Sequence, residues 1–551
     1  MTKKNRKNKS PIFDLRIVFL LTILSLFYCV NVFATTYYIS QNGNDSAGGT
    51  APETPWKTIA KINASSFQPG DEILFKRGDV WAEQLNISSS GKNDSPILFG
   101  AYGEGNKPTI DVNGKATHAI ISYASYITIQ ELVLQNSINN ALGIAVVGGC
   151  YGITVENIEI NNAGNNGISV TKGGSDINIS GVKIKNSSNN GIYLGGSELN
   201  KLSNVKVTNC TISGTKSNDG ICLHEDGNGN SAGTNFIIMN NYAENCAEQG
   251  YDITTGDFVW LDNNISKNNG QGGILIGHSA KKIFVSNHKS YDEPTQNTSA
   301  AINISGDYCD VNITKSLIQG NGYHLLRVTT DNVKIYNNTF IWDGGSEIID
   351  FSDVLNNIEF FNNVISTKQD TIGRMRFLNG FKYNESTIFK NNIYYAPSVM
   401  NILYNEKNYS LSEIQNQFNQ ETNSLFVNPS FEDKVNGNYE LKFNSPCIDK
   451  GIFITDVRSQ ESSNTIVVNN SKYFTDGFGL VDGQQLQFSD TNNISIISNI
   501  DYLNHKIIMN GTLSIKGNSK ISFSYYGISP DIGAFERKII APPDNLRIMN
   551  N

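Results

Sequence analysis

The sequence predicts an all-β solenoid, in which short strands stack on the equivalent strands of neighbouring repeats. Between residues 140 and 305 one phrase recurs, a glycine followed by Ile or Tyr, and its copies are Gly143-Ile144, Gly167-Ile168, Gly191-Ile192, Gly220-Ile221, Gly250-Tyr251 and Gly273-Ile274. Successive glycines are 24, 24, 29, 30 and 23 residues apart. A period of twenty-odd residues is typical of solenoids, because one unit has too little apolar surface for its own core. Inserts then project as loops from one side, so we expect function near the two longest intervals.

Two other patterns support stacked strands. Short β-branched segments recur from Ile120 to about Pro397, for example at 153–155, 177–179 and 311–313. Nearly all are followed by asparagines, such as Asn240-Asn241, Asn263-Asn264, Asn337-Asn338 and Asn362-Asn363. Asn tolerates left-handed backbone angles, and identical amides on successive coils can form hydrogen-bonded ladders. We therefore interpret these asparagines as structural.

The first 34 residues are expected to be a secretory signal peptide. Five basic residues among the first nine precede the apolar run 17–27, and Val32-Phe33-Ala34 fits a small-residue cleavage site. A retained membrane anchor is the alternative, although the run is slightly short for a span. A lipoprotein is disfavoured, because Tyr28 is large where a small residue should precede Cys29. The mature protein is thus expected to be secreted or periplasmic, with no membrane contact after cleavage.

Length and charge restrict the classes of partner. The mature chain exceeds a single globular core, so the repeats favour an elongated protein, which we expect to be a monomer. The net charge of −8 argues against nucleic acid, or a polyanion held by bulk electrostatics. A uronate polymer would need a local basic pocket or a bridging cation. Six cysteines remain after cleavage without metal-site spacing, and we predict free, packed thiols over disulfides.

The pattern divides the chain into five segments. We expect a signal peptide at 1–34, a β-helix at 35–400, further coils with a short helix (411–418) at 401–451, a small antiparallel β insert at 452–528, and a closing strand and tail at 529–551. Near the N-terminus, Thr54 reads as an N-cap with Pro55 at the first helical position. A helix there would plug the open end of the solenoid.

Several phrases resemble a known family. They are Tyr37-Tyr38-Ile39-Ser40-x-Asn42-Gly43-Asn44-Asp45, Pro69-Gly70-Asp71-x-Ile73-Leu74-Phe75, the Gly-Ile coils and the closing Ser529-Pro530-Asp531-Ile532-Gly533-Ala534-Phe535-Glu536. Together they resemble secreted bacterial right-handed parallel β-helix proteins of the pectin-lyase type, over nearly the whole mature chain. The resemblance implies a right-handed parallel β-helix, and the residue patterns above add an N-terminal capping helix and a small C-terminal β unit. It does not specify the reaction, since this architecture hosts lyases, epimerases, glycosidases and adhesins.

The repeat also predicts which side chains share one face. Side chains alternate across a strand, so if the residue after each glycine points inward, the second and fourth residues point outward. Tyr193, His224 and Asp252 would then stand outward on three adjacent coils, about 4.8 Å apart. The insert 225–233 directly follows His224 and would wall one side of a groove. We therefore predict these three residues as the catalytic group.

Other residues near this place are candidates for binding. We predict substrate contacts from Lys216, His278, Lys281 and Arg327. The pair Glu225 and Asp226 are candidate calcium ligands, so calcium is the one cofactor we consider.

The predicted site residues have structural alternatives. His224 would be a surface histidine bound to the insert, Asp252 a turn cap or a structural calcium ligand, and Tyr193 an ordinary sheet residue. Glu225 with Asp226 would be a solvated loop, and Lys281 a surface lysine.

One coil has a more specific resemblance. Asp219-Gly220-Ile221-Cys222-Leu223-His224-Glu225 resembles the active coil of mannuronan C5-epimerase modules, Tyr-Gly-Phe-Asp-Pro-His-Glu. Gly220, His224 and Glu225 match, whereas Asp219 stands at the Tyr position and Cys222 at the Asp position. The resemblance implies proton abstraction at C5 of a uronate, with the missing functions supplied by Tyr193 and Asp252.

Three functions are compatible with the sequence, all with a polysaccharide as partner. The first is a lyase or C5-epimerase acting on an acidic polysaccharide, with His224 as base or acid and Tyr193 as its partner. The second is a glycoside hydrolase using Asp252 with Asp219 or Glu225. There, about 5 Å between the carboxyls predicts retention, and roughly 6.5–9.5 Å predicts inversion. The third is a non-catalytic carbohydrate-binding or adhesive solenoid.

Overall fold

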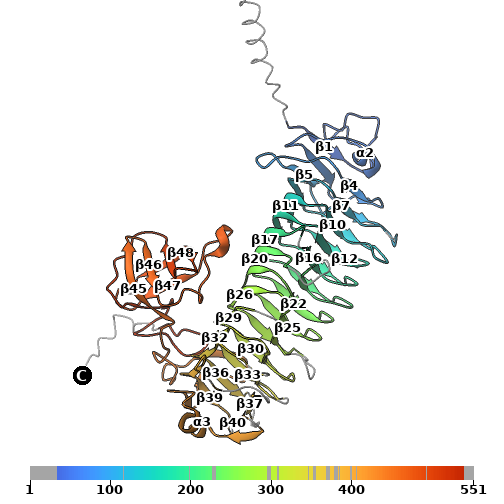
Figure 1. The fold of residues 1–551 in the computed structure, drawn as a ribbon. Coiled ribbons are helices and arrows are strands. Elements are labelled where there is room, and N and C mark those ends of the chain that lie inside the picture. The colour runs from blue at the N-terminus through green and yellow to red at the C-terminus, as the bar shows by residue number, and fades with distance from the viewer. Residues whose placement is uncertain are drawn as a thin grey trace, which may run out of the picture.

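The computed structural model describes residues 34–538, except 116, 198, 226–230, 294–299, 307–308, 345–346, 352–354, 368–372, 378–382, 384, 398–399, 405 and 492. The expected signal peptide therefore lies almost entirely outside the described residues, as does the tail from 539. Among the helices of the described segments, none is long and apolar enough to span a bilayer. Figure 1 shows an elongated stack of coils, with a compact β unit beside its C-terminal half.

Three sheets run along the stack, and each successive coil contributes one strand to each of them. In the described part of the chain each sheet has fourteen strands, parallel throughout except for the last pair of the third sheet. Sheet A consists of β1 (Thr36–Ile39), β2 (Glu72–Lys76), β5 (Ile97–Tyr102), β8 (Ile127–Gln130), β11 (Cys150–Glu156), β14 (Gly174–Ser180), β17 (Leu202–Thr208), β20 (Gly233–Met239), β23 (Asp257–Asp262), β26 (Lys281–Ser286), β29 (Val311–Thr314), β32 (Val333–Tyr336), β35 (Ile358–Phe361) and β38 (Thr387–Lys390).

Sheet B consists of β3 (Val80–Trp81), β6 (Thr109–Asp111), β9 (Val133–Gln135), β12 (Glu159–Asn161), β15 (Lys183–Lys185), β18 (Thr211–Ser213), β21 (Tyr242–Glu244), β24 (Ile265–Lys267), β27 (Lys289–Tyr291), β30 (Leu317–Gly320), β33 (Thr339–Trp342), β36 (Val364–Thr367), β39 (Ile393–Tyr395) and β42 (Leu425–Phe426). Sheet C consists of β4 (Leu85–Ile87), β7 (Ile120–Ser122), β10 (Ile144–Val147), β13 (Ile168–Thr171), β16 (Ile192–Gly196), β19 (Ile221–Glu225), β22 (Gln249–Ile253), β25 (Gly272–Ile276), β28 (Ile302–Ile304), β31 (Leu326–Val328), β34 (Ile349–Phe351), β37 (Gly373–Phe377), β40 (Met400–Tyr404) and β41 (Lys407–Tyr409). The predicted fold class, an all-β right-handed parallel β-helix, is confirmed.

The Gly-Ile phrase opens the strands of sheet C, and its geometry explains both residues. The residue after each glycine is fully buried and pairs with its counterpart on the next coil, as Ile192 does with Ile221. A Cβ built on Gly191 would lie 2.5 Å from the carbonyl oxygen of Gly220. Adjacent coils therefore approach too closely for any larger residue at this point.

Asparagine ladders join the coils at the turns, as predicted. In the interior, the Asn338 amide donates to Asn363, and the Asn363 amide donates to Asn392. A second ladder, called here the outer ladder, follows sheet A. Its members all have left-handed backbone angles, and they are Asn240, Asn263, Asn287, Lys315, Asn337, Asn362 and Asn391. Lys315 is the exception among seven consecutive coils.

In the described part of the chain, an α-helix lies at each end of the stack, as Figure 1 shows. Helix α2 (Ile59–Asn63) is capped by Thr58, so the predicted N-cap at Thr54 is wrong by four residues. The reason is that the backbone of Trp56 bonds with Tyr38 and Ser40, which keeps the segment before Thr58 extended. Helix α3 (Leu411–Phe418) has the predicted bounds and a complete capping box at Ser410.

The β unit beside the stack is a closed barrel of six antiparallel strands among the described residues. They are β45 (Thr455–Ser462), β46 (Thr465–Val468), β47 (Gln485–Phe488), β48 (Ile494–Asp501), β49 (Lys506–Met509) and β50 (Lys520–Phe523). The short 3-10 helix η1 (Gly477–Gly479) lies in its β46–β47 connection, and the hairpin β43 (Phe431–Asp433) and β44 (Asn438–Leu441) precedes it. Side chains from η1 and the adjoining loop pack on Ile237, Trp260 and Phe284 of sheet A.

The cysteines agree with the prediction of free, packed thiols. All six in the described part of the chain are unbridged and buried. Five of them pack in the stack, and Cys447 lies with the segment that precedes the barrel.

Candidate functional site

The predicted outward column on sheet C is present in the register of the strands. Tyr193 on β16 pairs with Cys222 on β19, which pairs with Asp252 on β22. His224 lies two residues after Cys222 and pairs with Gly195. The predicted register is therefore confirmed. The side chains are less exposed than their expected outward direction suggests. Tyr193 and His224 are half-buried, and Asp252 is only 9% exposed.

Asp219 extends a ladder that other coils build from asparagine. Asn166 Oδ1 accepts from the backbone of Asn190, and Asn190 Oδ1 accepts from the backbone of Asp219. Asp219 Oδ1 in turn accepts from the backbone N–H of Gln249 at 2.9 Å. An asparagine would serve the ladder equally well, so the structure places a carboxyl where the backbone needs only an amide oxygen.

Asp219, Cys222 and Asp252 form a compact buried group. One ligand atom from each residue lies within 4.8 Å of the others. Burial, followed by the charge of Asp252, raises the pKa of Asp219 to about 8. Burial also raises the pKa of Asp252, although the Thr254 hydroxyl, which donates to Asp252 Oδ1 at 2.5 Å, and nearby His224 oppose this. Each carboxyl thus disfavours ionisation of the other, and Asp219, with the pKa near 8, is the member that holds a proton at neutral pH.

His224 borders this group with a defined tautomer. Its Nδ1 lies 2.9 Å from the backbone carbonyl oxygen of Glu225, which can only accept. The proton therefore sits on Nδ1, and Nε2 is the basic nitrogen of the neutral ring.

The remaining predicted contacts are more scattered. Lys216 and His278 are exposed, before β19 and after β25, and the charge of His278 reaches Asp252. Lys281 begins β26 in sheet A and pairs with Asp257, so it is not on the sheet of the column. Glu225 ends β19, half-buried, while Asp226 lies outside the described residues.

Arg327 belongs to a second charged cluster that the sequence did not predict. It stands in the same outward column, and its Nε is 3.4 Å from Asp350 Oδ2. Buried His324 lies 3.8 Å from both Asp350 and Glu347, and Arg374 is 3.7 Å from Glu347. The signal was available, because Asp350 follows Ile349 as Asp252 follows Tyr251. The Gly-Ile phrase, which defines the column, stops before these coils.

The donor set of the compact group does not match calcium, which prefers six to eight oxygen ligands. Burial raises the pKa of the Cys222 thiol well above its ordinary value, so it offers a protonated sulfur. Among the described residues this is the one group of three such donors close enough to share an ion. The expected calcium pair Glu225 and Asp226 stays a prediction.

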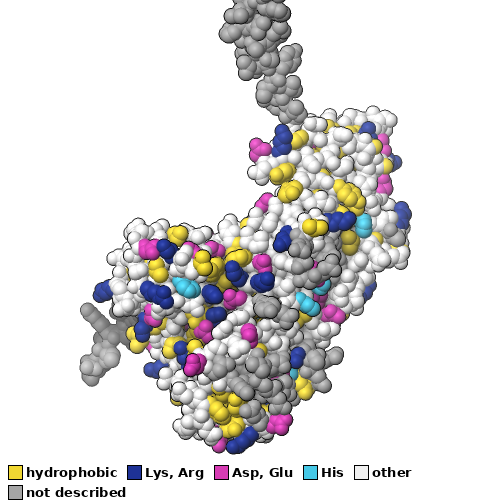
Figure 2. All heavy atoms as spheres, in the orientation of Figure 1, with side chains coloured by type: hydrophobic (Ala, Val, Ile, Leu, Met, Phe, Trp, Pro, Cys, Tyr) yellow, Lys and Arg dark blue, Asp and Glu magenta, His cyan; other side chains and the backbone are white. Residues whose placement is uncertain are grey.

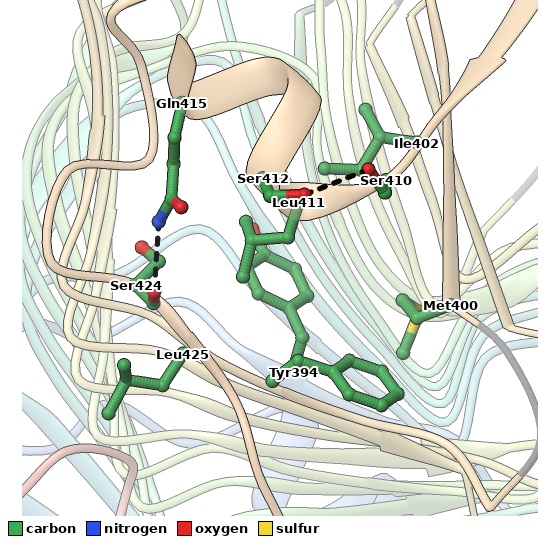
Figure 3. A pocket seen from close by; sticks show the side chains of 10 residues that line it. Tyr394, Met400, Ile402, Ser410, Leu411, Ser412, Gln415, Ser424 and Leu425 are labelled. Carbon is green, nitrogen blue, oxygen red and sulfur yellow. Dashed lines mark hydrogen bonds between the residues drawn. The ribbon is translucent and has the colours of Figure 1, made fainter.

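A separate apolar cavity of about 460 Å³ lies under α3 (Figure 3). Leu411, Met400 and Ile402 line it, and the Gln415 amide donates to the backbone of Ser424. Tyr394 is the one ionisable group among the described residues that line it, and its hydroxyl donates to buried Glu421. It therefore lacks the paired acids of the sheet C column.

Comparison with known proteins agrees with the fold. Residues 114–290 match a family model described as a right-handed beta helix region. The chain is 25% identical over 445 residues to an uncharacterized protein, YwoF, of Bacillus subtilis, covering 74% of this chain and 91% of the relative. A stretch of 87 residues, 14% of this chain, is 41% identical to a lacto-N-biosidase of Bifidobacterium longum, but spans only 5% of that relative.

Solved structures resemble the chain more distantly. The A-module of the mannuronan C-5 epimerase AlgE6 of Azotobacter vinelandii is 14% identical with a TM-score of 0.43, covering 66% of this chain and 92% of that one. Such a likeness concerns the course of the backbone and says nothing about the reaction.

Proposed function

We propose that this right-handed parallel β-helix protein is a carbohydrate-active enzyme that hydrolyses glycosidic bonds with the pair Asp219 and Asp252. The observation that carries the proposal is the close approach of two carboxyls in one buried group, within 4.8 Å. Glycoside hydrolysis needs such a pair, one acid to protonate the leaving oxygen and one carboxylate to face the sugar.

The burial of the two residues assigns their roles. Asp219 is 3% exposed and has its pKa raised to about 8, so it holds the proton at neutral pH and acts as the acid. Asp252 is the more exposed carboxyl, and the Thr254 hydroxyl orients it. A separation below the 6.5–9.5 Å of inverting enzymes favours retention, with Asp252 as nucleophile.

The electrostatics favour a neutral glycan over a uronate. Asp219 and Asp252 lie close enough to Glu248 for its charge to act on both, and the basic groups that influence Asp252 are the imidazoles of His224 and His278. A uronate carboxylate would meet this negative field, because the charges that act on Asp252 from the described residues include no lysine or arginine. The 87-residue match to a lacto-N-biosidase, a glycoside hydrolase, supports the same choice.

A uronate lyase or C5-epimerase is the second candidate. It is favoured by the neighbouring placement of Tyr193 and the basic Nε2 of His224 in the outward column. It requires a cation to neutralise the substrate, which Glu225 and Asp226 would have to bind as calcium. For either activity we propose a secreted or periplasmic monomer acting on a polysaccharide or oligosaccharide.

The test is a panel of neutral oligosaccharides, with alginate and pectate as uronate substrates, followed by product analysis. We expect hydrolysis of a neutral glycan with retained anomeric configuration, and a rate that declines above about pH 8 as Asp219 loses its proton. Asp252→Asn should lower kcat by roughly 10²–10⁴-fold. Unsaturated uronyl products or C5 inversion, with neutral glycans untouched, would establish the second candidate instead.

Asp350→Asn is the matched control on the same sheet, four coils beyond Asp252. We expect it to retain most of the hydrolytic rate. If Asp350→Asn abolishes hydrolysis while Asp252→Asn retains it, the catalytic pair has been assigned to the wrong coils.

A further inference from the structure

A second cavity lies between the barrel and sheet A, away from the column on sheet C. Its volume is about 310 Å³, within the range of small-molecule sites. Trp260, Asp262 and Lys315 line it from the β-helix, and Gln484, Phe523 and Ser524 from the barrel. Figure 2 shows basic, acidic and hydrophobic side chains mixed where the barrel meets the stack.

Lys315 is the residue that makes this cavity unusual. It occupies a position of the outer ladder at which the three preceding and three following coils have asparagine. Its φ of 51° is the left-handed conformation that asparagine adopts readily and lysine does not. Its backbone N–H still bonds to the next coil like the other members, so the ladder itself gives no reason for a lysine.

The side chain of Lys315 is directed to the cavity and not to an ion pair. In the described part of the chain no carboxylate oxygen lies within ion-pairing distance of its Nζ, which sits 5.7 Å from the centre of the Phe523 ring. Burial lowers the pKa of Lys315, while the charges of Glu536 and Asp262 oppose that effect. Lys315 is half-buried, and an ammonium partly removed from water with this little compensation is costly unless another group hydrates or binds it.

Two further polar groups of the cavity are open to a ligand. Ser524 Oγ is buried and has no hydrogen-bond partner among the described residues. Asp262 Oδ1 accepts from Ser286 and Asn287, and these bonds hold the carboxylate at the cavity wall. Trp260 and Phe523 supply ring surface beside them.

We propose that this cavity is a non-catalytic binding site for a neutral sugar of one or two rings. The ammonium of Lys315 and the carboxylate of Asp262 offset each other, so neither an anionic nor a cationic ligand gains from the net field. Sugar hydroxyls can accept from Lys315 and Ser524 and donate to Asp262, while the apolar face of a ring packs on the aromatic side chains. The site is independent of the reaction proposed for sheet C.

The experiment measures intrinsic tryptophan fluorescence and calorimetry on the full protein, titrated with lactose, N-acetylglucosamine and, as a charged comparison, galacturonate. We expect saturable binding of a neutral sugar with a fluorescence change that Trp260→Phe removes. Lys315→Asn, the residue of the neighbouring coils, should weaken binding at least tenfold without lowering the unfolding temperature or the rate of hydrolysis. Ser524→Ala tests the barrel wall if the first variant folds poorly, and should weaken binding several-fold.

Three results would overturn the proposal. They are no binding of either neutral sugar, tighter binding of galacturonate than of the neutral sugars, or unchanged affinity in the folded Lys315→Asn and Ser524→Ala proteins. Binding that persists in a protein inactive through Asp252→Asn would support it, because the two sites are then separate.

Discussion

Asp219 occupies the place that Asn166 and Asn190 hold on the two preceding coils. Lys315 similarly replaces an asparagine of the outer ladder. In a solenoid each coil repeats the same backbone requirements, so the neighbouring coils show which residue the fold alone would accept. A charged residue at such a place weakens the hydrogen bonds of the ladder or adds the free-energy cost of removing its charge from water. Such a residue is therefore a candidate for function.

Asp219→Asn should stabilise the protein, and more at high pH than at low pH. The folded-state pKa of about 8 lies above the ordinary aspartate value of about 3.9, so the folded protein binds more protons between these limits. The stability that Asp219 contributes is thus present below about pH 4 and is lost as pH rises towards 8. We expect a gain of about 1–3 kcal/mol at pH 8 and little at pH 4, measured by urea unfolding.

Asn190→Asp is the mirror control, because it places a second acid on the same ladder one coil away. It should destabilise the protein at pH 8 more than at pH 5. If the free energy of unfolding changes equally with pH in Asp219→Asn and in the parent protein, the raised pKa of Asp219 is contradicted.

At the scale of elements, the sequence predicted those strands whose residues are set by contacts between identical positions. The Gly-Ile phrase located the sheet C strands from Ile144 to Ile276, because the glycine is needed for close approach and the next residue for the core. It also placed Tyr193, Cys222 and Asp252 in register. The helix at 411–418 was located by its amphipathic pattern, and the structure adds a complete capping box.

Elements that depend on long-range pairing were less predictable. Thr54-Pro55 has a good helix-start signal, yet pairing of Trp56 with the first strand delays the helix to Ile59. The cluster of His324, Glu347 and Asp350 was missed because each residue comes from a different coil or turn, without a local motif. The one sequence signal, an acid directly after the buried residue of a sheet C strand, can be recognised only once the register of the coils is known.

Asn338→Ala should show how much the interior ladder stabilises the stack. The amide of Asn338 is fully buried, donates to Ile313, Tyr336 and Asn363, and accepts from the backbone of Ser316. Its removal leaves buried polar groups unpaired, at a cost of about 1–3 kcal/mol for such a group. We expect a loss of about 2–4 kcal/mol by urea unfolding, against less than about 0.5 kcal/mol for half-exposed Asn178→Ala. Similar losses in both variants would argue against a stabilising ladder.

At the scale of the whole molecule, the barrel is inserted between two neighbouring points of the chain. The backbone N–H of Gly451 donates to the carbonyl of Pro530 at 2.7 Å, so the chain leaves and returns at one place. The barrel is nevertheless held to the stack, since the Tyr336 hydroxyl donates to Tyr473 and the Tyr473 hydroxyl to Glu359. Both contacts and the cavity with Lys315 involve sheet A, so among the described residues the barrel is attached on a different face from the sheet C column.

Phe478→Ala tests whether this attachment is a stabilising interface. The Phe478 ring lies 5.6 Å from Phe258 and 6.4 Å from Phe284 between ring centres, and it joins the barrel to sheet A. Its loss removes apolar contact and two aromatic pairs, so the barrel should become less stable by about 1–3 kcal/mol. Limited proteolysis during thermal unfolding should then cut the barrel before the stack. Hydrolysis on sheet C should be unchanged and sugar binding at the Lys315 cavity weakened, because one wall of that cavity belongs to the barrel.

Phe443→Ala is the matched control, since this phenylalanine is 82% exposed. We expect its unfolding and its proteolytic pattern to equal those of the parent protein. If Phe478→Ala behaves like Phe443→Ala, the barrel is held by its polar contacts to Tyr336 and Glu359 and not by the aromatic interface. If Phe478→Ala lowers hydrolysis as much as sugar binding, the two sheets do not act separately, and a site confined to sheet C is wrong.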